Sequence, residues 1–516
     1  MAVLSAFAVV SVLFTGFYPP NGNPNELSRI EAVYAFVETG TFRIDDALQR
    51  FGDHEDKSAA NGHFYSNKAP GLIFAAVPVY RALRVVFPQP RFPWDPVFVV
   101  TRVLTVTLAS VLAAAVFLRR ARPLPEAPLV GAALLFGTPM LFYSRSLFGH
   151  AWTAALLFLA WDLSRGAAGS RRREDLGFFA SGLAAGWASI SEYTAAPLGV
   201  VLAARSAKTG SWRGLVLFAA GAATPMALLL LYNRACFGSP WVLSSAREAR
   251  PDFAQLSGRG LFGFGPPSPK IAWAYLFHPG RGLLWRSPFW IWIVPGFLAW
   301  WRSGKDRAEW ALCLAGVAGY FVILTGYENW HGGWATGNRY LLPILFFAGI
   351  PLLHALESPL SRCLFAAAAI FSGATHTLLS LSWPYFPDDL SWPAANGSVW
   401  FVVRGWVSPG LLPGILSLPL AFALCAVALY AGLRASRFSM PPKALGALAG
   451  VLLFVASLAV APGPSYGGRL FRSAMYGVFS GLDPSREELK AVVESAKTDA
   501  EKRHAAIAWR RFGPRP

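Results

Sequence analysis

The sequence predicts an all-α protein that crosses a membrane many times. Hydrophobic residues make up 54% of the chain and charged residues only 14%, whereas soluble domains carry about 25% charged residues. The hydrophobic residues also come in blocks long enough to cross roughly 30 Å of hydrocarbon, which takes about 20 residues of helix. Since backbone polar groups in lipid must be bonded within the protein, each block is expected to be a helix.

We predict about thirteen spans and assign residues 1–461 to one transmembrane domain. The first block has neither a basic start nor a small-residue cleavage site, so we expect it to remain as a span. No period of 20–50 residues is visible, which argues against a repeat architecture. The predicted spans are 1–18, 97–117, 127–144, 150–164, 177–190, 193–205, 214–232, 287–301, 309–326, 340–356, 363–381, 410–433 and 444–461.

Basic residues concentrate in the short loops between these blocks. An excess of lysine and arginine marks the cytoplasmic side, so the formal charge of +18 indicates a membrane topology rather than a nucleic-acid partner. All the clusters fall on one side if segment 70–87 does not span, which places the N-terminus in the cytoplasm and the C-terminus outside. The clusters are Arg119, Arg120 and Arg122; Arg165 with Arg171, Arg172 and Arg173; Arg205, Lys208 and Arg213; Arg302, Lys305 and Arg307; and Arg434, Arg437 and Lys443.

Segment 70–87 contains Arg81 and Arg84, so we predict a re-entrant or interfacial helix there. The long loops then lie outside, and loops of such length are usually functional. In the C-terminal tail, Ser485 and Glu488 form a capping-box pattern ahead of apolar residues at helical spacing, which predicts an amphipathic helix. The outer segments are 19–96, 233–286, 327–339, 382–409 and the tail 462–516.

The first outer loop is rich in acids. Glu26, Asp45 and Asp53 are candidates for a general base, and such acids also bind divalent metals, so a metal is left open. The alternative is a solvated loop with scattered charges. Lys68 precedes the interfacial helix and is a candidate for binding a phosphate at the headgroup level. The alternative for this lysine is to anchor the helix.

Two further groups of residues are candidates on the outer side. The second outer loop, 233–286, has far more arginine than acid, which suits an anionic ligand such as a lipid phosphate or adhesion to anionic headgroups. Between two later spans, Glu328, His331 and Arg339 lie close together in sequence among tryptophans and glycines. This spacing favours a site, with a structural histidine as the alternative.

His150 and Glu192 are predicted at the outer ends of spans. Ionisable residues at membrane depth are functional hypotheses by default. The alternative for each is a polar group that is satisfied at a helix end.

Two motifs resemble the GT-C glycosyltransferases that use polyprenyl-phosphate-linked sugars, in particular the aminoarabinose transferase and protein O-mannosyltransferase type. The run P-N-E-L-S-R-I-E-A-V-Y-A-F-V-E-T-G from Pro24 to Gly40 is similar to the opening of that family's first outer loop. The run Y-S-N-K-A-P from Tyr65 to Pro70 is similar to its later Tyr-x-x-Lys-Pro-Pro motif. Further short blocks resemble an uncharacterised bacterial branch of the same superfamily.

The resemblance implies a bundle of about thirteen helices with a large first outer loop, in a bacterial inner membrane. It implies that Lys68, in a motif that begins at Tyr65, contacts the donor phosphate, and we expect Arg339 and the basic loop 233–286 to neutralise that phosphate as well. Two positions depart from the family: Asn25 stands where an acid is usual, and His150 stands where the family tends to have an aspartate.

The resemblance also implies that a sugar moves from a polyprenyl phosphate to an acceptor on the outer face. An acid of the first loop would take the acceptor's proton, while His331 and Glu328 would shape the site or hold a metal. The alternatives are a transporter or flippase of lipid-linked sugars and, because of Asn25, a non-catalytic family member. The partners expected are the lipid donor, the bilayer and an unidentified acceptor, with no nucleic acid.

Overall fold

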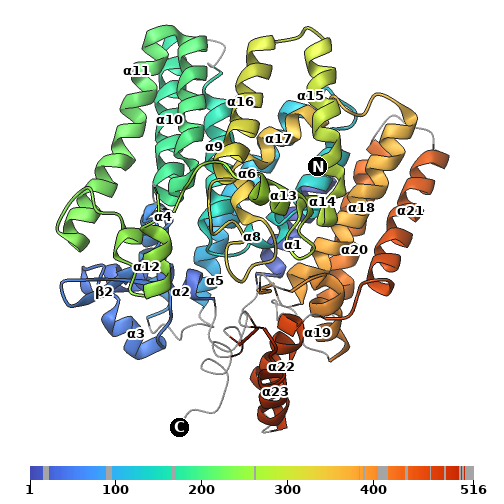
Figure 1. Cartoon of the computed structure of the whole chain (residues 1–516). Helices are drawn as coiled ribbons and strands as arrows, with labels where there is room; N and C mark the ends of the chain where they lie inside the picture. The colour runs from blue at the N-terminus through green and yellow to red at the C-terminus, as the bar shows by residue number, and fades with distance from the viewer. Residues whose placement is uncertain are drawn as a thin grey trace.

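The computed structural model is a bundle of helices with one two-stranded β-hairpin (Figure 1). It describes residues 1–15, 23–88, 96–165, 170–260, 263–382, 384–387, 390–404, 417–435, 440–464, 466–480, 484–498, 501–502 and 505. The helices are α1 (Ala2–Leu13), α2 (Pro24–Thr39), α3 (Asp45–Phe51), α4 (Gly71–Val86), α5 (Pro96–Arg102), α6 (Leu108–Ala121), α7 (Ala127–Phe136), α8 (Met140–Tyr143), α9 (Gly149–Leu163), α10 (Arg171–Ser191), α11 (Ala196–Phe237), α12 (Pro251–Ser257), α13 (Pro269–Phe277), α14 (Leu283–Arg286), α15 (Ile293–Arg302), α16 (Arg307–Leu324), α17 (Leu345–Leu352), α18 (Pro359–Leu381), α19 (Trp400–Val403), α20 (Ser417–Ala435), α21 (Met440–Ala459), α22 (Tyr466–Ser480) and α23 (Pro484–Glu494). Short 3₁₀ or π segments are η1 (Val103–Thr107), η2 (Tyr193–Ala195), η3 (Ser244–Arg247), η4 (Pro288–Trp292), η5 (Arg339–Ile344) and η6 (Ala394–Val399).

The all-α prediction is confirmed, and each predicted span overlaps a described helix. Four helical stretches within the described residues are long and apolar enough to cross a membrane by length and composition, and further apolar helices are shorter. The predicted number of thirteen is therefore not confirmed by helix length alone. The tail helix is found as α23, while the later tail residues Ala500 and Ile507 lie outside the described residues.

Helix α11 is two helical arms joined at Ser211, as the two separate predicted spans require. A continuous helix of 42 residues would be about 63 Å long, about twice the hydrocarbon thickness. Ser211 instead has a φ of 54°, and a Cβ added to Gly214 would overlap the backbone of Ser206, so the chain reverses there. Added Cβ atoms at Gly182 and Gly221 would likewise overlap backbone across the α10–α11 interface, so glycine permits this close packing.

Ion pairs connect the basic loops that were predicted to share one side. They join the ends of α6, α9 and α16 and the middle of α11 near Ser211: Arg119 and Arg120 to Asp162, Arg165 and Arg205 to Glu309, and Lys208 to Asp306. In Figure 1 the α15–α16 connection lies at the upper end of the bundle, whereas α2, α3, α12, α22 and α23 lie at the lower end. The charged loops are thus sorted between two opposite ends of the molecule.

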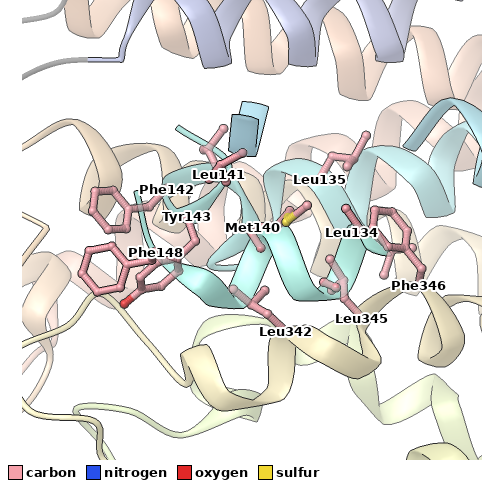
Figure 2. Packing of buried hydrophobic residues seen from close by; sticks show 14 of the residues in the cluster. Leu134, Leu135, Met140, Leu141, Phe142, Tyr143, Phe148, Leu342, Leu345 and Phe346 are labelled. Atoms are coloured by element: carbon pink, nitrogen blue, oxygen red, sulfur yellow. The ribbon is translucent and has the colours of Figure 1, made fainter. Parts of the chain in front are cut away.

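The hydrophobic core supports the segment that begins at Arg339. Figure 2 shows side chains of α7 and α8 packed against those of η5 and α17. Leu134 and Met140 on one side and Leu342 and Leu345 on the other are almost completely buried. This packing fixes the start of η5 relative to the bundle.

The strands β1 (Lys57–Ala60) and β2 (His63–Ser66) form an antiparallel hairpin, in register from Lys57 with Ser66 to Ala60 with His63. Its two turn residues, Asn61 and Gly62, have φ values of 53° and 78°. An Asn-Gly pair is favoured in such two-residue turns because both positions need a positive φ. The hairpin leads directly into the segment that carries Lys68.

Candidate functional site

Helix α2 carries much of the site, and its own sequence sets its ends. Asn23 accepts a hydrogen bond from the backbone N–H of Asn25, Pro24 occupies the first helical position, and Gly40 follows the helix with a φ of 71°. These features are a side-chain cap, a preset backbone angle and a left-handed residue that glycine adopts without strain. Local sequence therefore determines where α2 begins and ends.

Three charged side chains of α2 are buried, and each has a partner from another part of the chain. Charged residues are almost never fully buried unless paired, and moving an ion out of water costs several kcal/mol. The three buried pairs therefore connect α2 to distant segments through charged groups as well as through apolar packing. The pairs are Glu26 Oε2 with Arg102 Nη2 at 2.9 Å, Glu192 Oε1 with Arg29 Nη2 at 3.2 Å, and Glu31 Oε2 with His54 Nε2 at 2.7 Å.

The segment carrying Lys68 is fastened to α2 and to α10. The hydroxyl groups of Ser28 and Ser66 are 2.7 Å apart, and the backbone N–H of Lys68 donates to Ser66 Oγ at 3.2 Å. At the start of α4, the Gly71 carbonyl accepts a hydrogen bond from Trp187 Nε1 at 2.8 Å. Lys68 is thus held between α2 and α10.

Lys68 forms an ion pair with Asp56 inside the protein. The Nζ–Oδ2 distance is 2.9 Å, and the two side chains are 17% and 13% exposed. Burial acts to raise the pKa of Asp56, but the nearby positive charges of Lys68, His54 and Arg339 outweigh it and hold that pKa below its usual value. Asp56 is therefore ionised at neutral pH, and Arg339 lies within electrostatic reach of it.

Glu192 links the ends of α2, α9 and α10. It accepts the hydrogen bond from Arg29, and its Oε2 lies 3.7 Å from His150 Nδ1. Burial raises the pKa of Glu192, although the positive charges of Arg29, Arg339 and Lys68 act to lower it. Lys68 and Arg339, which act on Asp56, thus also act on Glu192.

Arg339 is the third cation of this group. Its guanidinium carbon lies 5.3 Å from the ring centre of Phe148 and 5.4 Å from that of Tyr340, within cation–π range. None of the ion pairs in the described ranges includes Arg339, and its Nε has no hydrogen-bond partner there. We refer to Arg29, Lys68, Arg339, Asp56 and Glu192 as the charged cluster.

The second outer loop docks beside Lys68. Asn67 Nδ2 donates to Glu248 Oε2 at 2.8 Å, Ser244 Oγ donates to the Asn67 carbonyl at 3.1 Å, and Ser58 Oγ donates to the Ser244 carbonyl at 2.7 Å. Arg250 of this loop contacts Glu55. The loop's arginines are therefore used partly to join it to the first loop.

The three acids predicted as candidate bases have other partners in the structure. Both carboxylate oxygens of Glu26 accept hydrogen bonds, from Arg102, from the backbone N–H of Leu147 and from Tyr385. Asp45 accepts from the backbone N–H of Phe64 and lies 3.4 Å from His63, which ties α3 to the hairpin. Asp53 is largely exposed and contacts Lys57 and the backbone N–H of His54. None of their ion pairs involves Lys68.

Of the remaining predicted residues, some lie at the charged cluster and others have partners elsewhere. His150 belongs to the cluster through Glu192, and Asn25 borders it because its carbonyl accepts a hydrogen bond from Arg29. Tyr65 packs in a small apolar group with Phe237, at 5.6 Å between ring centres. Glu328 pairs with the exposed Arg259, and His331 accepts from the backbone N–H of Gly333. These contacts do not link Glu328 to Arg339.

Sequence reasoning missed Asp56 and Arg29 as members of the site. Asp56 was one of many acids in a charged loop, and no spacing rule connects it with Lys68 twelve residues later. Arg29 lies four residues after Asn25, a spacing that puts both on one face of a helix, but the sequence predicted a loop there and the helix α2 is seen only in the structure. Its partner Glu192 is distant in sequence, so only the fold reveals the pair.

The described part of the chain offers no group of three or more histidine, cysteine or carboxylate side chains that would hold a metal ion. The carboxylates of the cluster are instead bonded to lysine and arginine. These residues do not fit a metal site, so no step is assigned to a metal.

No family model and no curated protein matches this chain. Among solved structures, ArnT from Cupriavidus metallidurans bound to undecaprenyl phosphate is similar, with a TM-score of 0.50 and 16% identity over 99% of this chain and 88% of that chain. The apo form of ArnT has a TM-score of 0.47 and 17% identity, over 99% of this chain and 87% of that chain. The apo oligosaccharyltransferase from Archaeoglobus fulgidus has a TM-score of 0.40 and 12% identity, over 100% of this chain and 60% of that chain. At such identities the likeness shows the fold alone, which is similar to that of ArnT.

Proposed function

We propose that this chain, which has a GT-C-like fold, is a membrane glycosyltransferase that takes a sugar from a polyprenyl-phosphate donor. The observation that supports this most directly is the charged cluster. It gathers three cations from separate parts of the chain at one place, and one of them, Arg339, has no carboxylate partner in the described ranges. Arg339 is only partly exposed, and a cation with little access to water and without a carboxylate partner suits an anionic ligand.

The charges of the cluster match a lipid phosphate. Arg29, Lys68 and Arg339 carry one more unit of positive charge than Asp56 and Glu192 carry of negative charge. A polyprenyl phosphate that bears a sugar is a phosphodiester with a single negative charge, so it balances the site. Arginine binds phosphate through a planar fork and lysine through a point charge, and both are present.

The proposed reaction is a displacement at the anomeric carbon of the sugar. An acceptor hydroxyl forms the new bond to that carbon, and the bond from the carbon to the phosphate oxygen breaks. The polyprenyl phosphate leaves with the electron pair, and the developing negative charge is stabilised by Lys68, Arg29 and Arg339. The hydroxyl proton goes to a carboxylate.

We assign the proton-accepting role to Asp56 rather than to Asp45, Asp53 or Glu26. Asp56 contacts Lys68, and its lowered pKa keeps it in the ionised form that can accept a proton. Glu192 then holds Arg29 and His150 in place. This assignment explains how the chain can work with Asn25 at the position where an acid is usual in the resembling family.

We also propose a side of the membrane for the charged cluster. The cluster lies at the end of the bundle opposite the paired basic loops, which we assign to the cytoplasmic side of a bacterial inner membrane. The donor would then lie in the outer leaflet, and the acceptor would be a glycan, lipid or protein on the outer face.

The test is transfer or release of sugar by the purified full-length chain, using a panel of polyprenyl-phosphate sugars. Lys68→Ala is expected to abolish release, whereas Lys270→Ala, which removes an exposed cation from the second outer loop, serves as a matched control. Release that is unaffected by Lys68→Ala would refute the assigned site. Lipid movement across vesicles without sugar release from any donor would support the flippase alternative. If the chain shows neither sugar release nor lipid movement, a non-catalytic family member is favoured.

A further inference from the structure

Arg281 and Arg286 of the second outer loop do not point to a ligand, although the sequence predicts this for arginines there. Arg281 donates to the carbonyls of Gly333 and Phe386, at 2.7 and 2.6 Å, and to that of Ala335. One guanidinium thereby connects the second outer loop, the 327–339 loop and the segment containing Phe386. Five N–H donors in a fixed plane make arginine suited to join several carbonyls at once.

Arg286 continues this arrangement toward Arg339. Its two terminal nitrogens donate to the carbonyls of Thr336 and Gly280. Gly337 follows directly, and a Cβ there would lie 3.3 Å from Arg286 Nη1 and 2.8 Å from Pro139. The backbone N–H of Arg339 then donates to the Gly337 carbonyl at 2.8 Å. The backbone leading into Arg339 is therefore set by its contact with Arg286.

Arg286 also places a positive charge in the interior. It is 5% exposed, and none of the ion pairs among the described residues includes it. Burial and the neighbouring charge of Arg281 lower the pKa of Arg286, which means that the folded protein holds this charge at an energetic cost. Neutral donors could bond the same two carbonyls, so the guanidinium brings a positive charge to this place in addition to the hydrogen bonds.

We propose that Arg286 is a positioning residue for anion binding, which fixes the backbone before Arg339 and adds positive potential behind the lipid-phosphate site. The inference rests on the proposed function, since the anion is the phosphate group of the lipid donor or product. Arg286 touches carbonyls rather than the ligand, and it acts through Arg339.

The experiment measures binding of undecaprenyl phosphate to the purified full-length chain in detergent, with uncharged undecaprenol as the comparison lipid. Arg286→Gln removes the charge and part of the fork, and Arg286→Lys keeps the charge but cannot reach both carbonyls as a planar fork. Arg234→Gln removes an exposed arginine from the end of α11 and is the matched control. Melting temperature and the salt dependence of binding are recorded for each variant.

The expected result is that Arg286→Gln weakens binding of undecaprenyl phosphate by about tenfold or more, with a smaller loss for Arg286→Lys. Undecaprenol binding and the Arg234→Gln control should be unchanged, and the salt dependence should become shallower in Arg286→Gln because less positive potential acts on the phosphate. A role in folding alone would lower the melting temperature without separating the two lipids.

Three outcomes overturn the inference. Equal affinity for undecaprenyl phosphate in the wild type and in every folded Arg286 variant would do so while leaving the proposed function intact. If Arg286→Gln does not fold, wild-type affinity in Arg286→Lys is decisive in the same way. A wild-type chain that does not distinguish undecaprenyl phosphate from undecaprenol would overturn both this inference and the proposed donor.

Discussion

Replacement of Glu26 by glutamine distinguishes a structural acid from a catalytic one. The sequence makes Glu26 a candidate base, whereas the structure gives it three hydrogen-bond donors and a buried ion pair with Arg102, the two side chains being 3% and 4% exposed. Glutamine can still accept from Leu147 and Tyr385, so the main change is the loss of the charge that compensates Arg102. We therefore expect Glu26→Gln to act chiefly on stability.

The size of the effect follows from burial. Removing one partner of a buried ion pair costs about 3–5 kcal/mol because the other charge stays buried without compensation. Glu38→Gln is a matched control on the same helix, where the pair with Arg84 is more exposed and should contribute no more than about 1 kcal/mol. Neutralising Arg102 in the Glu26→Gln background should restore part of the loss.

The assay is equilibrium unfolding of the purified chain in mixed detergent micelles, followed by circular dichroism and tryptophan fluorescence. A free energy of unfolding for Glu26→Gln within about 1 kcal/mol of the wild type, together with lost sugar transfer, would refute the structural assignment. It would return Glu26 to the role of base that the sequence suggested.

Three further predictions concern the charged cluster and the neighbouring buried acid Glu31. Asp56→Asn should abolish sugar transfer while undecaprenyl phosphate still binds, because Lys68 loses its internal partner but keeps its charge; loss of lipid binding as well would contradict a role as base. Glu31→Gln should change the pH dependence of stability: burial raises the pKa of Glu31, so its contribution is fully present below the usual value of 4.5 and is lost as pH rises through the raised value. Melting curves between pH 4 and 7 should therefore show a relative decline in the wild type that is absent in Glu31→Gln, and parallel curves would argue against the raised pKa. Gly149→Ala should reduce transfer, because the new Cβ would overlap the Glu192 carboxylate, whereas Gly319→Ala, with nothing within 4 Å of its Cβ, should behave as the wild type; equal activity in both variants would show that Glu192 is not held by this contact.

Several features of the fold were accessible from sequence because their causes are local. Hydrophobic blocks of sufficient length predicted the helices, and the reversal at Ser211 was anticipated by the basic break between two blocks. The cap at Asn23, the helix end at Gly40 and the helix at 70–87, found as α4, also follow from neighbouring residues. A short motif predicts Lys68 as a phosphate contact, and its partner Asp56 is seen only in the structure.

The membership of the charged cluster was not accessible in this way. Asp56 and Asp53 have the same chemistry and lie three residues apart, yet only Asp56 contacts Lys68, while Asp53 contacts Lys57 at the surface. Which acid turns inward depends on the path of the chain into the β-hairpin and on what packs over it. Arg29 with Glu192 is a contact between residues 163 positions apart, which no local pattern encodes.

The sequence by itself determined the class of the protein: a helical membrane chain in which short basic loops and long loops alternate between hydrophobic blocks. These properties depend on composition and on spacing along one helix or loop. The tertiary structure decided which charges meet, because an ion pair or a carbonyl contact requires groups from distant segments to be brought within a few ångströms. It assigned Glu26 to a buried pair with Arg102 and gathered Arg29, Lys68 and Arg339 around Asp56 and Glu192.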